Sequence, residues 1–271
     1  MLDSATDFAR LVGLELRRSW ILTLRYRTET ALSLAFLVVL FYGIVFGTRW
    51  AAFGQFALGD GVEGLLLGFI CWILATGGVS HVANDIEEEA KTGTLEPLFL
   101  GHPGPEALFL ARNTAGLVAG LPVLLLVGAA LTLATRSSFH FSPAALLPLL
   151  ALDLAASGIG FALGALAILV KHVRVAVIVG QLVVVALLIT HIDLPGAPWV
   201  VSFLPLAPDV DSLRQLMLSG SGLTVAAAAL LLANGAAYFG TGLALFFLAT
   251  RRARARTAGT ALRQLAHRPE G

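Results

Sequence analysis

Residues 84–113, NDIEEEAKTGTLEPLFLGHPGPEALFLARN, are a long polar passage between two stretches that are almost entirely apolar. An acidic run that ends at Glu89 opens the passage, and Gly93 interrupts its helical pattern. Thr94 can then cap a new helix, because its hydroxyl can accept a hydrogen bond from a backbone N–H two or three residues further on. The passage therefore predicts a polar loop over residues 85–109 that contains a short helix.

Apolar side chains define one face of that short helix. Leu95, Leu98 and Phe99 follow one another at the spacing i, i+3, i+4, which places them together on a helix. Pro97 falls in the first turn, where its missing N–H costs nothing, and Gly101 is a suitable stop. We expect about a turn and a half of helix, roughly 9 Å long, with an apolar surface.

Composition places the chain in a membrane. Of its 271 residues, 57% are hydrophobic and 13% are charged, whereas soluble domains carry about 25% charged residues. Windows without charge recur along the chain, and the first five are each close to the roughly 20 residues that a helix needs to cross the hydrocarbon. The sixth, residues 215–250, is longer, and we interpret it as one span led by an outer loop. The sequence thus predicts a single all-α integral membrane domain over residues 1–271. Its six predicted spans cover approximately residues 29–48, 64–84, 110–135, 143–170, 174–192 and 223–250.

The distribution of basic residues predicts the orientation. Of the 18 Lys and Arg residues, 15 lie in the N-terminal tail, the passage 84–113, the fourth loop and the C-terminal tail of residues 251–271. The other three, Arg49, Arg136 and Arg214, lie on the opposite side. Positive charge marks the cytoplasmic side of a membrane protein, so we expect both termini and the passage in the cytoplasm. The expected location is the inner, cytoplasmic membrane of the cell, with the basic tail on anionic lipid.

Residues 5–28 predict a helix that lies in the membrane interface. An apolar i, i+4 ladder runs along it, formed by Phe8, Val12, Leu16 and Trp20. A basic face opposes the ladder, as in membrane-surface helices, and consists of Arg10, Arg17, Arg18 and Arg25. The alternative is an unstructured basic tail that only sets the orientation of the spans.

Residues 194–222 join the last two predicted spans on the outer side. Three prolines interrupt the apolar residues, and Asp209 or Asp211 can cap a short helix that ends at Gly220. The segment is apolar but too short to cross the membrane twice, so it predicts a re-entrant helical hairpin. Non-helical backbone at that depth has to be buried in protein or face water.

Asp153 is an acid inside a predicted span, and an ionisable residue in a span is a candidate pathway residue. It precedes Lys171 by 18 residues, or about 27 Å of helix, which places it near the outer headgroups. We interpret it as an interfacial acid, with a substrate contact or a proton relay as the alternative.

Small residues inside the spans indicate packing. The pairs Gly116-x-x-x-Gly120 and Gly160-x-x-x-Gly164 have the spacing that lets helix backbones approach closely in lipid. Cys71 is the single cysteine, so no internal disulfide is expected, and its position in mid-span predicts core packing.

Catalytic patterns are absent from the sequence. No G-x-x-x-x-G-K-[ST] occurs, and the six histidines show no zinc-ligand spacing. We therefore predict no catalytic, cofactor-binding or metal-binding residue, and a chain that is not an enzyme. The alternative is a membrane enzyme or scaffold, in which His191 and Asp193 would bind a metal or serve a hydrolase with Ser202. The arginines follow the membrane and form no basic folded face, so no nucleic-acid partner is expected.

The polar passage resembles the cytoplasmic loop between the second and third spans of the permease subunits of type-2 ABC exporters. The matching residues are the acidic Glu87 to Glu89, Gly93-Thr94-Leu95-Glu96, Leu98-Phe99 and Pro103. A second match precedes the last predicted span. It consists of Phe203-Leu204-Pro205 followed by Leu213-Arg214-Gln215-Leu216.

The resemblance implies a transport subunit that moves an amphiphile, a drug or a glycoconjugate outward. Such a permease pairs with a second copy or a paralogue and with two copies of a separate ATPase subunit, which binds the ATP. The residues that would couple it to the ATPase are Thr94, Leu95, Glu96, Leu98 and Phe99. The alternative within the same resemblance is a permease of haem export and cytochrome c maturation, in which His140 and His191 could contact haem.

Overall fold

The computed structural model describes residues 5–53, 61–94, 97–98, 104–137, 139, 142–169, 174–189 and 203–266. Every regular element in these residues is a helix and none is a strand, which confirms the predicted all-α class. The elements are α1 (Ala5–Arg25), α2 (Arg27–Phe53), α3 (Val62–Thr92), α5 (Pro105–Thr135), the 3-10 turn η1 (Pro143–Ala145), α6 (Leu146–Leu169), α7 (Arg174–Ile189), α9 (Ala207–Leu218) and α10 (Val225–Ala266).

Five helices of the described chain are long and apolar enough to cross a membrane. They are α2, α3, α5, α6 with its preceding turn, and α10, so the chain is a membrane protein. α7 carries a shorter apolar stretch, Val175–Leu188. The last residues of the predicted fifth span, 190–192, lie outside the described residues. The count of six spans stays a prediction.

The polar loop is shorter than the sequence suggested. α3 continues to Thr92, so the acidic run lies on a helix, where Lys91 Nζ and Glu87 Oε1 form an i, i+4 ion pair at 2.7 Å. Gly93 ends α3 with φ of 74°, a left-handed conformation that glycine adopts without strain. α5 begins at Pro105, ahead of the predicted start of the span, because proline suits the first position of a helix. Little more than ten residues separate the two helices.

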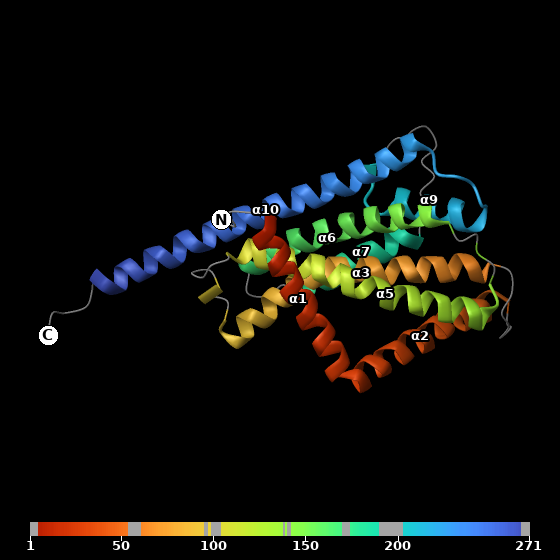
Figure 1. Cartoon of the computed structure of the whole chain (residues 1–271), viewed down its shortest axis with the longest axis horizontal. Helices are drawn as coiled ribbons and strands as arrows, with labels where there is room; N and C mark the ends of the chain where they lie inside the picture. Colours follow the sequence, from red (N-terminus) through yellow and green to blue (C-terminus); the bar gives the residue numbers. More distant parts are fainter. Residues whose placement is uncertain are drawn as a thin grey trace.

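α6 lies between α3 and α10 in the centre of the bundle (Figure 1). Its small residues allow this close packing. A methyl group added to Gly160 would lie 2.3 Å from the carbonyl oxygen of Gly78 on α3. One added to Gly158 would lie 2.4 Å from the carbonyl oxygen of Tyr238 on α10. Cys71 is fully buried in the same core, as its position predicted.

Three of the four glycines in the predicted pairs pack closely against a neighbouring helix, and one does not. Gly164 packs on Val82 and Gly116 on the ring of His81, and with Gly160 they confirm the packing role. The prediction is wrong for Gly120, because a methyl group there would meet nothing within 4 Å. The helix turns this glycine toward a cavity and away from a neighbouring backbone.

α1 confirms the predicted N-terminal helix. It ends at Arg25, and the chain turns sharply at Tyr26 into α2, so that α1 crosses the bundle (Figure 1). The ladder residues Phe8, Val12 and Leu16 are half-buried, whereas Trp20 is exposed. The four arginines of the predicted basic face are exposed, namely Arg10, Arg17, Arg18 and Arg25. Their contact with lipid headgroups stays a prediction.

The predicted outer segment is described from residue 203 onward, and residues 190–202 lie outside the described chain. α9 forms where the sequence predicted a short helix and packs against α3 and α6. Its buried apolar face consists of Val210, Leu213 and Leu216. The re-entrant hairpin as a whole stays a prediction.

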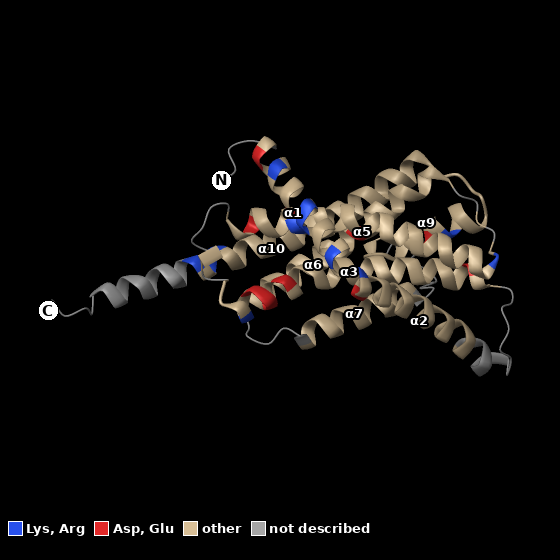
Figure 2. Ribbon diagram, turned by 60° about the horizontal axis from the view of Figure 1, so that its bottom comes forward, with Lys and Arg blue, Asp and Glu red and all other residues tan. Residues whose placement is uncertain are grey.

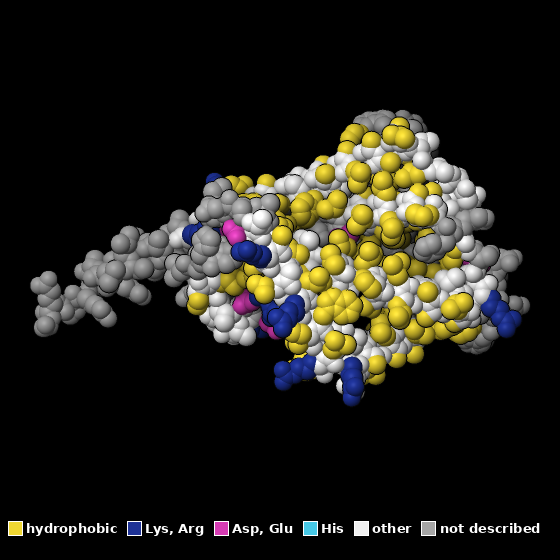
Figure 3. Space-filling model, viewed as in Figure 1, with side chains coloured by type: hydrophobic (Ala, Val, Ile, Leu, Met, Phe, Trp, Pro, Cys, Tyr) yellow, Lys and Arg dark blue, Asp and Glu magenta, His cyan; other side chains and the backbone are white. Residues whose placement is uncertain are grey.

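Charged side chains are unevenly spread over the described residues. Figure 2 shows acidic and basic residues gathered near α1, the end of α3 and the tail of α10. Hydrophobic side chains cover the middle of the face in Figure 3. This banding is what a protein embedded in hydrocarbon requires, because charge is costly at the bilayer centre.

Candidate functional site

Arg112, on α5, joins three helices where the charged end of the bundle begins. Its Nη1 lies 2.8 Å from Glu89 Oε1 on α3, and its Nε lies 3.6 Å from Glu15 Oε1 on α1. The three side chains are 14%, 17% and 14% exposed, in the order Arg112, Glu89, Glu15. Shielding from water strengthens such ion pairs, and the contact with Glu89 is also a hydrogen bond, whereas the contact with Glu15 is electrostatic only. Arg112 therefore fixes the position of α1 against α3 and α5.

The same carboxylate holds the start of the polar loop. The Thr94 backbone N–H donates to the Glu89 carbonyl at 3.0 Å, and the Thr94 hydroxyl donates to the Glu89 carboxylate. The Leu98 N–H then donates to the Thr94 carbonyl at 3.2 Å, which forms one helical turn. Glu89 thus links Arg112 directly to the first residue of the loop.

Two of the five predicted coupling residues are described, Thr94 and Leu98. Leu98 is half-buried and packs against an apolar cluster of α3, α5, α6 and α10 that includes Ile86, Phe109 and Phe246. Leu95, Glu96 and Phe99 lie outside the described residues. The described part of the loop is therefore in contact with the spans that flank it.

The far end of the loop is fixed to α10. Glu106, in the first turn of α5, is 8% exposed and accepts a hydrogen bond from the Thr250 hydroxyl at 2.7 Å. Its second oxygen lies 2.5 Å from Nη2 of Arg254. The sequence interpretation missed Glu106, Arg112 and Arg254 as a set. The available signal was their charge at or just beyond the ends of two predicted spans.

A row of aromatic rings leads from Arg112 into the core. The guanidinium lies 5.6 Å from the centre of the Phe109 ring, which meets Phe246 edge-on with centroids 5.8 Å apart. Phe246 in turn contacts Phe161 on α6 at 5.4 Å. Close-packed rings transmit displacement because they have little room to yield. A movement of the loop is thereby connected to α6 and α10.

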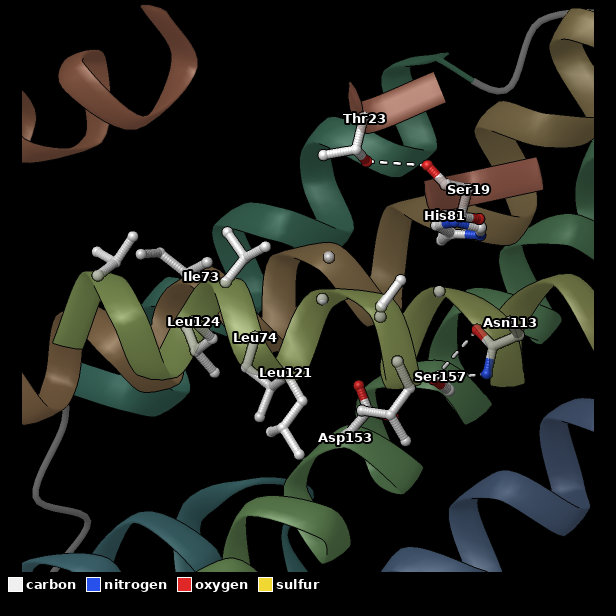
Figure 4. A pocket seen from close by; sticks show the side chains of 18 of the residues that line it. Ser19, Thr23, Ile73, Leu74, His81, Asn113, Leu121, Leu124, Asp153 and Ser157 are labelled. Atoms are coloured by element: carbon white, nitrogen blue, oxygen red, sulfur yellow. Dashed lines mark hydrogen bonds between the residues drawn. The ribbon is translucent and has the colours of Figure 1, made fainter. Parts of the chain in front are cut away.

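A cavity of about 460 Å³ lies beside this network, between α1, α2, α3, α5 and α6 (Figure 4). Its polar lining includes Asn113, Ser157, Asp153 and His81. Asn113 Nδ2 and Ser157 Oγ lie 3.1 Å apart, and Asn113 directly follows Arg112 in the chain. The ion-pair network and the cavity thus share one turn of α5.

Asp153 lies inside α6, within the predicted fourth span. The span that contains it begins at Pro143, where the Ser142 hydroxyl accepts a hydrogen bond from the Ala144 N–H. Ten residues of helix, about 15 Å, precede Asp153. Its side chain is buried, with 6% of the residue exposed, and borders the cavity. The position of Asp153 relative to the outer headgroups stays a prediction.

Asp209, in the first turn of α9, is a second buried acid. It is 1% exposed, and its Oδ1 has no hydrogen-bond partner among the described residues. Burial raises the pKa of Asp209 from 3.8 to about 8. Folding therefore favours the protonated carboxyl, and ionisation opposes folding.

Replacing Asp209 with Asn should raise the Tm of the detergent-solubilised protein at pH 9 by about 2 °C or more, equivalent to roughly 1 kcal/mol. A carboxyl whose pKa is higher in the folded state loses stability as pH rises, here between about 4 and 8. The amide has no such loss, so the variant should match the wild type at pH 4. Asp211→Asn, on the same helix with a 42% exposed side chain, is the control. Equal pH slopes for both variants would contradict the prediction.

Other predicted features are outside the described chain. His140, His191, Asp193 and Ser202, on which the haem and enzyme alternatives depended, all lie there. Among the described residues, no group of three or more His, Cys, Asp or Glu side chains could hold a metal ion.

Comparison of the sequence with known proteins assigns it to no family. No protein-family model matches the sequence, and no curated protein matches it significantly. The fold and the site define the chain as an all-helical membrane protein whose polar loop is tied to its spans by partly buried ion pairs.

Proposed function

We propose that the chain is the transmembrane permease subunit of an ABC-type exporter that moves an amphiphile, a drug or a glycoconjugate outward. A separate ATPase subunit would dock on residues 85–109 and bind the ATP. The single observation that carries the proposal is the anchoring of the polar loop at both ends. Glu89 and Arg112 hold its start, and Glu106 holds its end to Arg254.

Anchoring at both ends suits a loop that transmits force. If an ATPase pushes on a loop that is free at either end, the loop bends and the spans stay in place. Here the start of the loop is tied through Arg112 to α1, α3 and α5, and its end through Glu106 to α10. The closing of the ATPase would therefore displace four helices together, and with them the cavity beside Asn113.

The proposed assembly contains two permease chains, identical or paralogous, and two ATPase copies. A pathway between two bundles explains why one chain alone needs no wide channel. α7, which lies in the predicted fifth span of residues 174–192, would complete the six. The inner membrane, with both termini and the polar loop in the cytoplasm, is the proposed location.

Phe99→Asp should abolish ATPase binding, which tests the proposal. The chain would be tagged at its native expression level, purified in detergent and assayed for vanadate-sensitive ATP hydrolysis. Interfaces of this kind depend on a few apolar anchors, and the loss of one costs about 2 kcal/mol or more, roughly 30-fold in affinity. An unpaired charge buried at the contact adds to that cost. We expect at least a tenfold loss of co-purified ATPase activity, with Glu96→Ala milder.

The matched control is Phe203→Asp, the same substitution at an exposed phenylalanine that shortly precedes α9 and lies outside the polar loop. Phe203 is 67% exposed, so this variant should keep the wild-type ATPase activity. Membrane levels of the three proteins would be matched by immunoblotting. Wild-type protein without ATP hydrolysis, or Phe99→Asp with undiminished hydrolysis, would refute the docking role.

The orientation is tested by labelling single cysteines in a Cys71→Ala protein. Because Cys71 is fully buried in α3, its replacement leaves the surface unchanged. Cysteines at Thr92 and Ala258 should be shielded from an impermeant thiol reagent in intact cells, whereas one at Ser219 should react. Permeabilised cells should label at all three positions. Reaction at Thr92 from outside would reverse the orientation and remove the polar loop from the cytoplasm.

A further inference from the structure

The buried carboxylate of Asp153 has too few partners in its own chain. Among the described residues it forms no ion pair, and the hydroxyl beside it is that of Ser157, one turn further along α6. A carboxylate offers about four acceptor sites, and the single hydroxyl proton of Ser157 can fill one. Ser157 is also shared with Asn113. A buried carboxylate is costly unless it is paired with a cation.

The cavity beside Asp153 has room for such a cation. Its volume of about 460 Å³ falls within the roughly 300–1,000 Å³ of small-molecule sites. Figure 4 shows Asp153 and Ser157 on one side of the cavity and Ser19, Thr23 and His81 on the other. Most of the remaining lining is aliphatic, for example Ile73, Leu74, Leu121 and Leu124. One carboxylate in an aliphatic lining fits a ligand with one positive charge on an apolar body.

We infer that this cavity binds an organic monocation, an ammonium group attached to an apolar body, through Asp153. The inference rests on the proposed function, since the cation would be the exported substrate. The ammonium would donate a charge-assisted hydrogen bond to the carboxylate, which is stronger than a neutral one. His81, the titratable group across the cavity, has its Nδ1 3.6 Å from Asp85 Oδ2 and lies outside this contact.

The lining also argues against a zwitterionic lipid headgroup as the ligand. Among the described lining residues there is no Lys or Arg that could take a phosphate. Phosphatidylethanolamine has an ammonium group but would bring its phosphate with it. A free monocation matches the charge of the cavity, and the lipid headgroup does not.

Dansylcadaverine, a fluorescent primary amine, is the test ligand, and its N-acetyl derivative is the matched uncharged ligand. Binding to the purified chain in nanodiscs without an ATPase would be followed by dansyl fluorescence. Acetylation of the amine and Asp153→Asn should each weaken binding at least tenfold. Glu63→Gln, an acid at the start of α3 that does not line the cavity, should bind within twofold of wild type.

Two glycine-to-leucine variants, one at the cavity and one away from it, test the position of the ligand independently of its charge. Gly120 borders the cavity and has open space at its Cβ, so Gly120→Leu should block the site without disturbing the packing. Gly240→Leu, at an equally open glycine on α10 away from the cavity, should leave binding unchanged. Size-exclusion chromatography would verify that each variant is folded.

Several results would overturn the assignment. These are equal binding of the acetylated ligand, wild-type affinity of Asp153→Asn, or wild-type affinity of Gly120→Leu. Displacement of dansylcadaverine by phosphatidylethanolamine would assign the cavity to a lipid headgroup instead. Because the assay contains no ATPase, its failure would leave the co-purification result on Phe99 intact, and the two proposals fail separately.

Discussion

Gly242→Ala should separate α10 from α6 and lower the Tm of the purified protein by roughly 6–12 °C. A Cβ at Gly242 would lie 1.8 Å from the carbonyl oxygen of Gly158. Ordinary contact needs 3.4 Å or more, so the helices would have to part by at least 1.6 Å, the difference between the two distances. Backbone atoms cannot rotate away as a side chain can. Overpacking therefore costs about 3 kcal/mol, the upper end of its usual range.

The control for this prediction is two residues away. A Cβ at Gly240 would meet nothing within 4 Å, so Gly240→Ala keeps the same helix and the same change of residue without the clash. Alanine is the better helix former, and this variant should be as stable as wild type or slightly more so. Thermal unfolding in detergent measures both. Equal Tm values for the two variants would mean that α6 and α10 do not approach this closely.

Arg112→Gln should release α1 from the bundle. The substitution leaves Glu15 and Glu89 half-buried without the cation between them. Removal of one partner from a buried ion pair costs roughly 3 kcal/mol or more, which corresponds to about a 100-fold change in an opening equilibrium. Hydrogen–deuterium exchange of the amides of α1 should accelerate by about that factor, while those of α6 change little.

Arg18→Gln is the matched control for Arg112. Arg18 also pairs with Glu15, at 3.4 Å, but its side chain is 56% exposed. Exposed pairs are worth about 0–1 kcal/mol, so exchange in α1 should rise less than about fivefold. If both variants accelerate exchange equally, charge alone and not the buried position of Arg112 holds α1. If neither does, apolar contacts such as Leu16 hold it.

The elements of the fold could be predicted from local sequence. Charge-free windows located all five long helices, because a span has to be apolar over about 20 consecutive residues. The ladder from Phe8 to Leu16 predicted α1. A short helix capped by Asp209 or Asp211 was also predicted, and α9 forms there, but the cap was wrong, because α9 begins at Ala207 with Leu206 at its N-cap. Boundaries were less accurate. Hydropathy alone ended the second predicted span at residue 84, whereas the helix α3 continues through the acidic residues to Thr92.

The candidate site was predicted only in part, because its partners are far apart in the chain. Glu106 and Thr250 are separated by 144 positions, and no local pattern couples them. The same holds for Arg112, which the sequence marked only as one more basic residue near the cytoplasmic end. Asp153 was singled out from its sequence alone. Its burial and the cavity beside it depend on side chains of α1, α2, α3 and α5, which no local pattern brings together.

Sequence by itself determined that this is an all-α membrane protein with an amphipathic N-terminal helix and a polar loop between two of its spans. Those properties follow from hydropathy and spacing within single segments. Only the tertiary structure decided that Gly158 meets Gly242, that Gly120 faces a cavity, and that Arg112 lies between Glu15 and Glu89. The physical reason is that the rotation of each span about its own axis is not set by its hydropathy. A span is apolar on all sides, so its hydropathy does not fix which side faces a neighbour, and close packing of small residues with buried charges decides it.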